Sequence, residues 1–425
     1  MEESEEINLN PLVYEDNIDA NEECYLINEG KSSNSDMNQY RDNEIVEIDT
    51  INNTSFENIQ KKPQRIYYID FLRIFANFLV IYIHASAVNI ERVDFRSHQW
   101  YGLFIQSHIS YHCVPLFVAI SGVFFLNPEK ELPYKKLYQK YIFHIVKSLL
   151  FWAPFYAIVD RFIINFNHIP YSFNKVVLHE TIKSCFLAYG HLWYLYFVIG
   201  LYMITPFLRP IVKDRRAAWY AVWFFFIFRH IIPSVDRMFK AFSYKYGISY
   251  LTEFKSELKI ELLGDLTTYY LLGYLLSSGH IKNKFYIYLL SLMGIISPFL
   301  NAGVGYLECY HRGMEQSDFN TYYENLFVSL STIGTFIFFK YIVSGWVEPL
   351  MRVEIIKKFV LKLSECSFGS YLVHMAVYNL YHRFKIHSTI HPTYYWIFVY
   401  SVLIYMTSFI IIYILRKISI FKHVT

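Results

Sequence analysis

Polar residues interrupt the first long apolar run of the chain at helical spacing. The run from Tyr67 to Val88 is long enough to cross a bilayer, yet it carries Asp70, Arg73, Asn77 and His84. An imidazole can take up a proton near neutral pH, and a guanidinium can bind a phosphate or a carbonyl oxygen. On a helix, Arg73 and His84 share one face about 16 Å apart along the axis, with Asp70 and Asn77 within about 60° of Arg73. Because lipid does not tolerate such groups, we expect this stripe to face a protein interior or a water-filled cavity and to mark a functional site.

We predict that His84 and Arg73 belong to this functional site, with Asp70 and Asn77 beside them on the same stripe. The alternative for Arg73 is a structural ion pair with Asp70, three residues earlier on the same helix. A secondary transporter or flippase of an envelope intermediate also fits the stripe, because it could use these groups as a proton relay. A third interpretation is a non-catalytic membrane sensor.

The composition indicates a polytopic membrane protein. Of 425 residues, 54% are hydrophobic and 20% aromatic, and only 18% are charged, which is unlike a soluble domain of this size. Residues 1–60 hold sixteen Asp and Glu against two basic residues, so their net charge is −14 and residues 61–425 carry +17. We predict a disordered, acidic, cytoplasmic tail over 1–60 and an all-helical transmembrane domain over 61–425. Membrane lipid is therefore a partner, nothing indicates a nucleic acid, and the oligomeric state stays open.

Hydropathy predicts about ten transmembrane helices around a central polar cavity. They are expected at 66–88, 100–125, 141–164, 191–208, 217–232, 262–278, 285–302, 326–346, 368–380 and 394–415. The segments on one side of these spans carry twenty Lys and Arg against about thirteen on the other. The positive-inside rule therefore places both termini in the cytoplasm of a multi-pass protein of the plasma (inner) membrane. No basic region followed by an apolar core precedes the first span, so insertion is expected to begin there.

The sequence predicts no metal site. Its five cysteines are scattered and show neither CxxC nor Cys/His spacing. Cys185 and Cys309 could pair near the outer side, although ordinary buried thiols are favoured. His108 and His112 lie four residues apart on one predicted helix face, where cavity lining or hydrogen bonding is favoured over metal binding.

Four separated segments resemble the membrane-bound acyltransferase 3 family, whose members O-acylate glycans and related acceptors. They are YYIDFLRIFANFLVIYIHAS, VPLFVAISGVFFLNPEKELPYKK, HLWYLYFVIGLYMITPFLRPIV and SFGSYLVHM, in the family's order across about 66–415. The second and third are most similar to the enterobacterial common antigen O-acetyltransferase branch, a ten-helix enzyme without a fused soluble catalytic domain. The resemblance implies an O-acyltransferase whose acyl group is expected to be acetyl. The donor would be cytoplasmic acetyl-CoA or another acyl-CoA, and the acceptor a hydroxyl of a surface polysaccharide or lipid-linked glycan precursor. No tightly bound cofactor is expected.

The Arg and His that the family requires map onto Arg73 and His84 by their ten-residue spacing. The resemblance implies that both residues are required for transfer. We expect a neutral His84 to accept the proton of the attacking hydroxyl, and Arg73 either to bind a phosphate or carbonyl group of coenzyme A or to orient Asp70. His374 matches another recurrent family histidine, and we expect it either to support the site or to be a hydrogen-bonded group of the bundle. Ser121 and Gly122 allow close backbone approach, for which helix packing is the favoured explanation.

One block, from His191 to Arg209, opens at the outer side with an aromatic end. His191, Trp193 and Tyr194 are expected to bind the glycan acceptor, with an aromatic belt at the membrane interface as the alternative.

Basic residues follow at the inner side of the same block. Arg209, Arg215 and Arg216, together with Lys136, are expected to bind the phosphates of coenzyme A, with a purely topogenic charge cluster as the alternative. Arg229 and Lys340 are further charges within spans, for which we expect partners among such groups or snorkelling.

Overall fold

The computed structural model describes residues 65–159, 175–187, 190–242, 249–258, 266–314, 316–317, 323–390 and 394–425. Contacts divide the chain into Met1–Ile66 and Tyr67–Thr425, and the second unit is described below. All regular structure in the described residues is helical, as expected. The predicted disorder of the acidic tail falls outside the described residues.

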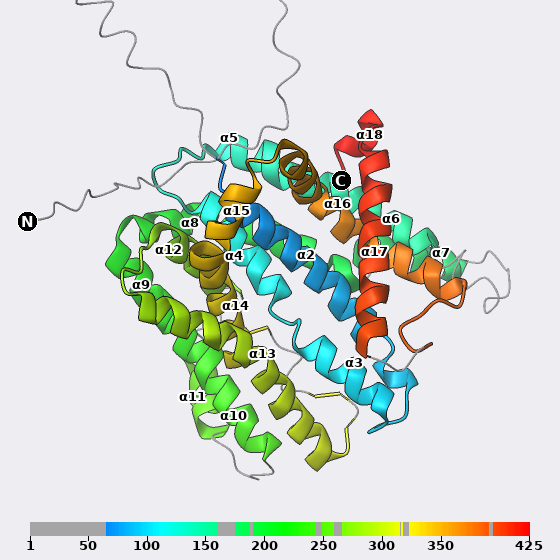
Figure 1. Ribbon diagram of the computed structural model, residues 1–425, viewed down its shortest axis with the longest axis horizontal. Coiled ribbons are helices and arrows are strands. Elements are labelled where there is room, and N and C mark those ends of the chain that lie inside the picture. The colour runs from blue at the N-terminus through cyan, green and yellow to red at the C-terminus, as the bar shows by residue number, and fades with distance from the viewer. Residues whose placement is uncertain are drawn as a thin grey trace, which may run out of the picture. The chain divides into compact units, whose positions relative to one another are not determined.

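The helices follow one another without any strand in the described part of the chain (Figure 1). In chain order they are α2 (Tyr67–Ala87), η1 (Ile90–Arg92), α3 (His98–His108), α4 (Cys113–Phe125), α5 (Tyr134–Lys136), η2 (Leu137–Ile142), α6 (Phe143–Val159), α7 (Lys175–Leu187), η4 (Gly190–Leu192), α8 (Trp193–Lys213), α9 (Arg215–Phe225), η5 (Phe226–Ile231), α10 (Ile232–Ala241), α11 (Ser249–Glu257), α12 (Thr267–Ser278), α13 (Lys284–Arg312), α14 (Leu326–Phe338), η7 (Phe339–Val343), α15 (Ser344–Leu350), α16 (Glu354–Arg383), α17 (Tyr394–Leu415) and α18 (Ser419–Lys422).

Eight helical stretches of the described residues are long and apolar enough to cross a membrane, so the protein is a multi-pass membrane protein. They are Tyr67–Arg92, His98–Phe125, Tyr134–Val159, Leu178–Lys213, Arg215–Ala241, Lys284–Arg312, Leu326–Leu350 and Tyr395–Leu415. The other two predicted spans, 262–278 and 368–380, correspond to α12 and α16. Over its described residues α12 is too short to span, and α16 is long enough but more polar than the eight.

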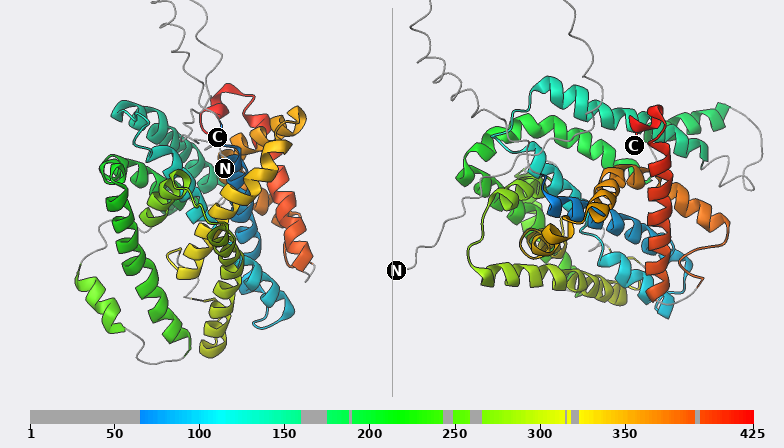
Figure 2. Two further views of the ribbon diagram at one scale, coloured as in Figure 1. Left: turned by 60° about the vertical axis from the view of Figure 1, so that its left-hand side comes forward. Right: turned by 45° about the horizontal axis from the view of Figure 1, so that its top comes forward.

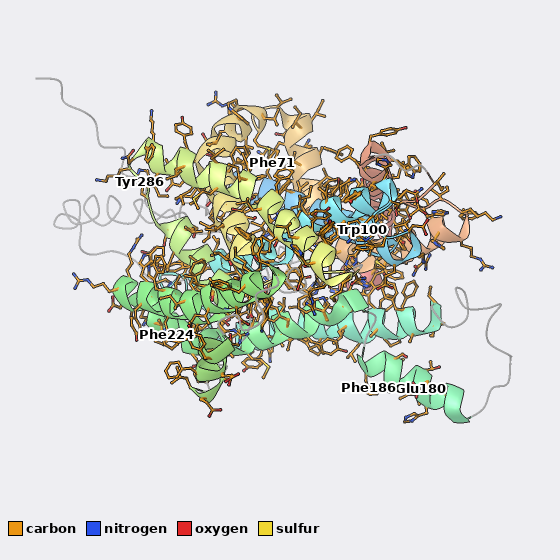
Figure 3. All side chains as sticks on the ribbon, turned by 90° about the horizontal axis from the view of Figure 1, so that it is seen from below. Phe71, Trp100, Glu180, Phe186, Phe224 and Tyr286 are labelled. Carbon is orange, nitrogen blue, oxygen red and sulfur yellow. The ribbon has the colours of Figure 1, made fainter. Side chains whose placement is uncertain are left out.

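Helix α2 lies inside the bundle, where it packs against α3, α4, α16 and α17 (Figures 1 and 2). The outer faces of the peripheral helices carry the large apolar side chains that lipid would cover. Tyr286 on α13 and Phe186 on α7 are more than half exposed on the outside, whereas Trp100 on α3 is fully buried (Figure 3). The polar stripe of α2 therefore faces protein, as predicted.

The backbones of α4 and α12 approach each other closely. A Cβ placed on Gly122 would lie 1.9 Å from the Tyr270 carbonyl oxygen, and one on Gly273 would lie 1.9 Å from the Ala119 carbonyl oxygen. Only residues without a side chain fit there. The packing interpretation of Gly122 is thus confirmed, and Gly273 is its counterpart on α12.

Replacing Gly273 by alanine is expected to destabilise the protein by about 3 kcal/mol, because the new methyl group meets main chain that cannot move aside. Thermal midpoints of the detergent-solubilised protein, followed by size-exclusion chromatography, measure the loss. Gly200→Ala on α8 is the matched control, since nothing lies within 4 Å of the added Cβ. Equal midpoints for the two variants would contradict this packing argument.

The predicted helix over 100–125 is wrong in one respect, because two helices occupy this span. Helix α3 ends at His108, and His112 is the N-cap of α4, so the two imidazoles do not share one continuous helix face. Pro115 lies in the first turn of α4, where its missing N–H needs no intrahelical partner. His108 stacks on Phe104 and bonds to its carbonyl oxygen at 2.5 Å, which agrees with the hydrogen-bonding interpretation.

Two spans also extend beyond their predicted ends. The fifth runs through η5 and continues past 232 as α10, where Pro233 occupies the first turn. The seventh continues past 302 to Arg312 and ends at Gly313, whose φ of 66° provides the left-handed C-cap.

The remaining charges and thiols have plain structural roles. Arg229 pairs with Glu324 at 2.6 Å, and Lys340 donates to the carbonyl oxygens of Leu276, Ser277 and Gly279 that end α12. Their partners are thus a loop carboxylate and a helix terminus rather than one another. Cys185 and Cys309 are both free thiols, which agrees with the favoured interpretation and not with the alternative of a disulfide.

Candidate active site

Three histidines from separate elements meet at the C-terminal half of α2. The His84 ring lies 5.2 Å from the His374 ring of α16 and 6.5 Å from the His191 ring of η4, measured between centroids. The His191 and His374 rings are 5.0 Å apart. His191 and His374 are buried, and His84 is half-buried. The structure thus joins three side chains that the sequence assigned to different roles.

Hydrogen bonding fixes the tautomer of His374. Its Nδ1 lies 2.5 Å from the Tyr371 carbonyl oxygen, one turn earlier on α16. Because a carbonyl oxygen can only accept, Nδ1 carries the proton and Nε2 presents a lone pair. This Nε2 is buried and has no hydrogen-bond partner among the described residues. It is therefore an acceptor available to a proton on a neighbouring group.

His191 is held by α16 as well. Its Nε2 donates to the Leu372 carbonyl oxygen at 3.3 Å, and the Tyr371 hydroxyl donates to the His191 carbonyl oxygen. Tyr156 of α6 donates to the same Leu372 oxygen at 2.7 Å and meets the His191 ring edge to face, with centroids 4.8 Å apart. The position of His191 relative to His374 is therefore fixed from three elements.

Arg73 lies deeper along the same interface between α2 and α16. Its Nη1 donates to Ser364 Oγ at 3.2 Å, and Ser364 Oγ donates to Asp70 Oδ1 at 2.7 Å. The direct Arg73 to Asp70 separation is 4.0 Å, so the serine hydroxyl bridges the pair. The guanidinium also lies 5.8 Å from the Phe124 ring centroid, and the Arg73 side chain keeps 23% of its surface exposed. Part of its donor set remains available to a ligand.

Helices α2 and α16 run parallel, and their polar side chains meet at two positions along the helix axes. Arg73 meets Ser364 at one level, and His84 meets His374 at the other. The intervals are eleven and ten residues, about 16 Å on a helix. Asn77 is fully buried between these levels. The predicted single polar edge of α2 is confirmed, and α16 supplies its counterpart.

Aromatic rings extend from the histidines to the surface. Tyr194 lies 5.8 Å from Tyr371, which itself lies 5.7 Å from His191. Trp193, which is 40% exposed, stacks on Tyr323 at 5.6 Å. These rings form a continuous wall that can pack against the apolar faces of a sugar.

The predicted basic residues take different positions. Arg209 donates to the carbonyl oxygens of Phe125 at 2.8 Å and Lys130 at 2.5 Å, so it binds the C-terminal end of α4. This end includes Phe124, whose ring lies beneath the Arg73 guanidinium. Arg215 approaches Gly279 at the end of α12.

Two further basic residues belong to neighbouring surface segments. Arg216 is exposed in the first turn of α9, and its backbone N–H donates to the carboxylate of the N-cap residue Asp214. Lys136 belongs to the short helix α5. Arg209 therefore has a structural task that the sequence did not reveal.

Three residues that the sequence analysis left unassigned complete the site: Ser364, Tyr156 and Tyr323. Only Ser364 had a usable signal, since it precedes His374 by almost the interval that separates Arg73 from His84. Among the described residues, no group of three or more His, Cys, Asp or Glu side chains is arranged to hold a metal ion.

The fold and this site define a multi-pass membrane protein with a buried polar edge of two parallel helices. The family described as an acyltransferase domain matches residues 66–417. The chain therefore belongs to this acyltransferase 3 family and is a membrane acyltransferase that transfers groups other than aminoacyl groups. No curated protein and no solved structure matches it.

Proposed function

We propose that the protein transfers an acyl group, most simply acetyl, from cytoplasmic acyl-CoA to a hydroxyl of a surface polysaccharide or lipid-linked glycan precursor. The meeting of His84 with His374 on the same helix pair that holds Arg73 is the observation that carries this proposal. The motif likeness to the enterobacterial common antigen branch supports acetyl as the group. The basic end segments support a plasma-membrane protein with cytoplasmic termini.

In this mechanism His84 is the general base. Its imidazole takes the proton of the acceptor hydroxyl while that oxygen attacks the thioester carbonyl. The C–S bond then breaks, and the departing thiolate of coenzyme A takes the proton back from the imidazolium. The imidazolium that forms needs an acceptor in a weakly polar site. The lone pair on His374 Nε2 supplies it, because the Tyr371 carbonyl oxygen fixes the opposite nitrogen as the donor. His374 then stabilises the charged base without reacting itself.

Arg73 binds the donor in the same mechanism. Ser364 and Asp70 hold one edge of its guanidinium, and the exposed part can bind a phosphate or the thioester carbonyl oxygen. The separation of about 16 Å between Arg73 and His84 suits an extended pantetheine arm that reaches from the cytoplasmic side. Arg209, Arg215, Arg216 and Lys136 add positive charge at that side for the nucleotide phosphates.

The acceptor approaches from the other side, along the wall formed by Trp193, Tyr194 and Tyr323. Stacking on these rings would bring a sugar hydroxyl toward His84.

Acetyl transfer in membranes tests the proposal. Membranes with and without the protein are supplied with acetyl-CoA labelled in the acetyl group, and label is measured in the glycan and lipid-linked glycan fractions. We expect label in one of these fractions only when the protein is present. Labelled substrate that accumulates inside vesicles and is lost with the proton gradient, without any acylated product, would favour transport and contradict the proposal.

A further inference from the structure

A compact basic cluster lies at the far end of α2 and α16, beyond the three histidines. Arg92 of η1 donates from Nη1 to His382 Nε2 of α16 at 2.7 Å. The His382 ring lies 5.6 Å from the ring of His387, which follows α16. An arginine that donates to a histidine instead of a carboxylate leaves its charge uncompensated.

No carboxylate of the described residues pairs with Arg92, His382 or His387. The adjacent Glu91 accepts instead from the Gln316 side chain at 2.6 Å. Burial, then Arg92 and His387, lower the pKa of His382, and burial, then Arg92, lower the pKa of His387. The Arg92 guanidinium and the two imidazoles thus lie together without a carboxylate, and a bound anion would compensate the charge of Arg92.

Buried hydrogen bonds build this cluster into the fold. The Asn89 amide, which is fully buried, donates to the Tyr378 hydroxyl and to Ser388 Oγ, both at 2.8 Å. It thereby ties the η1 turn to α16 and to the segment that carries His387. The positions of all three basic side chains therefore depend on a rigid scaffold and not on chance proximity at a surface.

The cluster lies at the level expected for lipid headgroups. Trp396, in the first turn of α17, donates from Nε1 to the His387 carbonyl oxygen at 3.0 Å, and Tyr395 beside it is 66% exposed. Such aromatic residues mark the membrane interface. Phe384, 68% exposed, adds an apolar side chain to the same segment. A ligand here would meet both positive charge and an apolar surface.

The basic cluster lies close to the proposed active site along helix α16. His382 follows His374 by eight residues of the continuous helix α16, about 12 Å along its axis. We propose that Arg92, His382 and His387 bind the phosphate or diphosphate group of a lipid-linked acceptor, so that a sugar hydroxyl of that acceptor reaches His84. This assignment rests on the proposed acyltransfer to a glycan, and it selects the lipid-linked precursor as the acceptor.

Binding without donor tests the site separately from catalysis. The full chain in phosphatidylcholine nanodiscs is titrated with geranylgeranyl diphosphate by calorimetry, and the double variant Arg92→Gln/His387→Gln is compared with the unchanged protein. Loss of two charge-assisted contacts should weaken binding about tenfold or more. The control is Arg96→Gln/His98→Gln, which removes the same residue types from the turn before α3 and from its first position, and which should bind as the unchanged protein does.

Equal binding by the double variant and its control would overturn the proposal. Inorganic pyrophosphate binding as tightly as the prenyl compound, or full competition by phosphatidylglycerol in the nanodiscs, would assign the site to a free anion or to bulk headgroups and would likewise overturn the acceptor assignment. Acetyl transfer measured on the same variants separates the two proposals, because transfer that persists without diphosphate binding contradicts only this one.

Discussion

Replacing His84 by alanine is expected to reduce acyl transfer by about a hundredfold to ten-thousandfold, the range that a positioned general base contributes. The residue lies on the polar edge of α2, 5.2 Å from the ring of His374, so its loss removes the proton acceptor and leaves the donor-binding residues in place. Initial rates of labelled acetyl transfer in membranes measure the effect, with kcat falling and the KM for the donor nearly unchanged.

His98→Ala provides the matched control for this variant, because His98 is an exposed histidine in the first turn of α3 and belongs to no part of the site. Both variants should elute as the unchanged protein does in size-exclusion chromatography. Undiminished transfer by a correctly folded His84→Ala protein would remove His84 from catalysis.

The polar edge of α2 could be predicted because the membrane makes its residue types informative. In an apolar span, a charged or ionisable side chain is costly unless protein surrounds it, and helical periodicity then fixes its face. Arg73 and His84 both meet α16 as this argument requires. The same reasoning located the helices, since eight long apolar helices recover most of the predicted spans.

Periodicity within one helix could not predict which distant elements meet. The sequence predicts that His191 binds the acceptor at one end of its own block, and it gives no indication that Leu372 and Tyr371 of α16 hold this residue. Ser364 bridges Asp70 and Arg73 across almost three hundred positions of sequence, and its ten-residue interval to His374 is the only sequence feature that relates it to the site. Long-range pairing of this kind depends on helix packing, which local patterns do not encode.

Helix breaks and caps were missed for a related reason. Hydropathy alone joined α3 and α4, although Pro115 in the first turn of α4 favours a new helix start. Gly313 ends α13 ten residues beyond its predicted limit because hydropathy falls before the hydrogen-bonded helix ends. Apolar content reports where lipid lies, whereas backbone geometry decides where a helix stops.

Replacing Arg73 by alanine is expected to raise the KM for the acyl-CoA donor by tenfold or more, about the value of a charge-assisted contact, with a smaller change in the KM for the acceptor. The reason is that Arg73 is fixed on one edge by Ser364 and partly exposed on the other, and in the proposed mechanism this exposed part binds the donor and not the acceptor. Arg73→Lys should recover only part of the affinity, since an ammonium group lacks the planar fork.

Ser364→Ala and Lys358→Ala distinguish a positioned guanidinium from general positive charge. Loss of the Ser364 hydroxyl removes the bridge to Asp70, so it should raise the donor KM while leaving the charge of Arg73 intact. Lys358 is exposed near the start of α16 and pairs only loosely with Glu354 at 3.7 Å, so its removal should leave the donor KM unchanged. If Arg73→Ala and Lys358→Ala give the same donor KM, Arg73 acts only as a structural partner of Asp70, and the donor must be bound elsewhere.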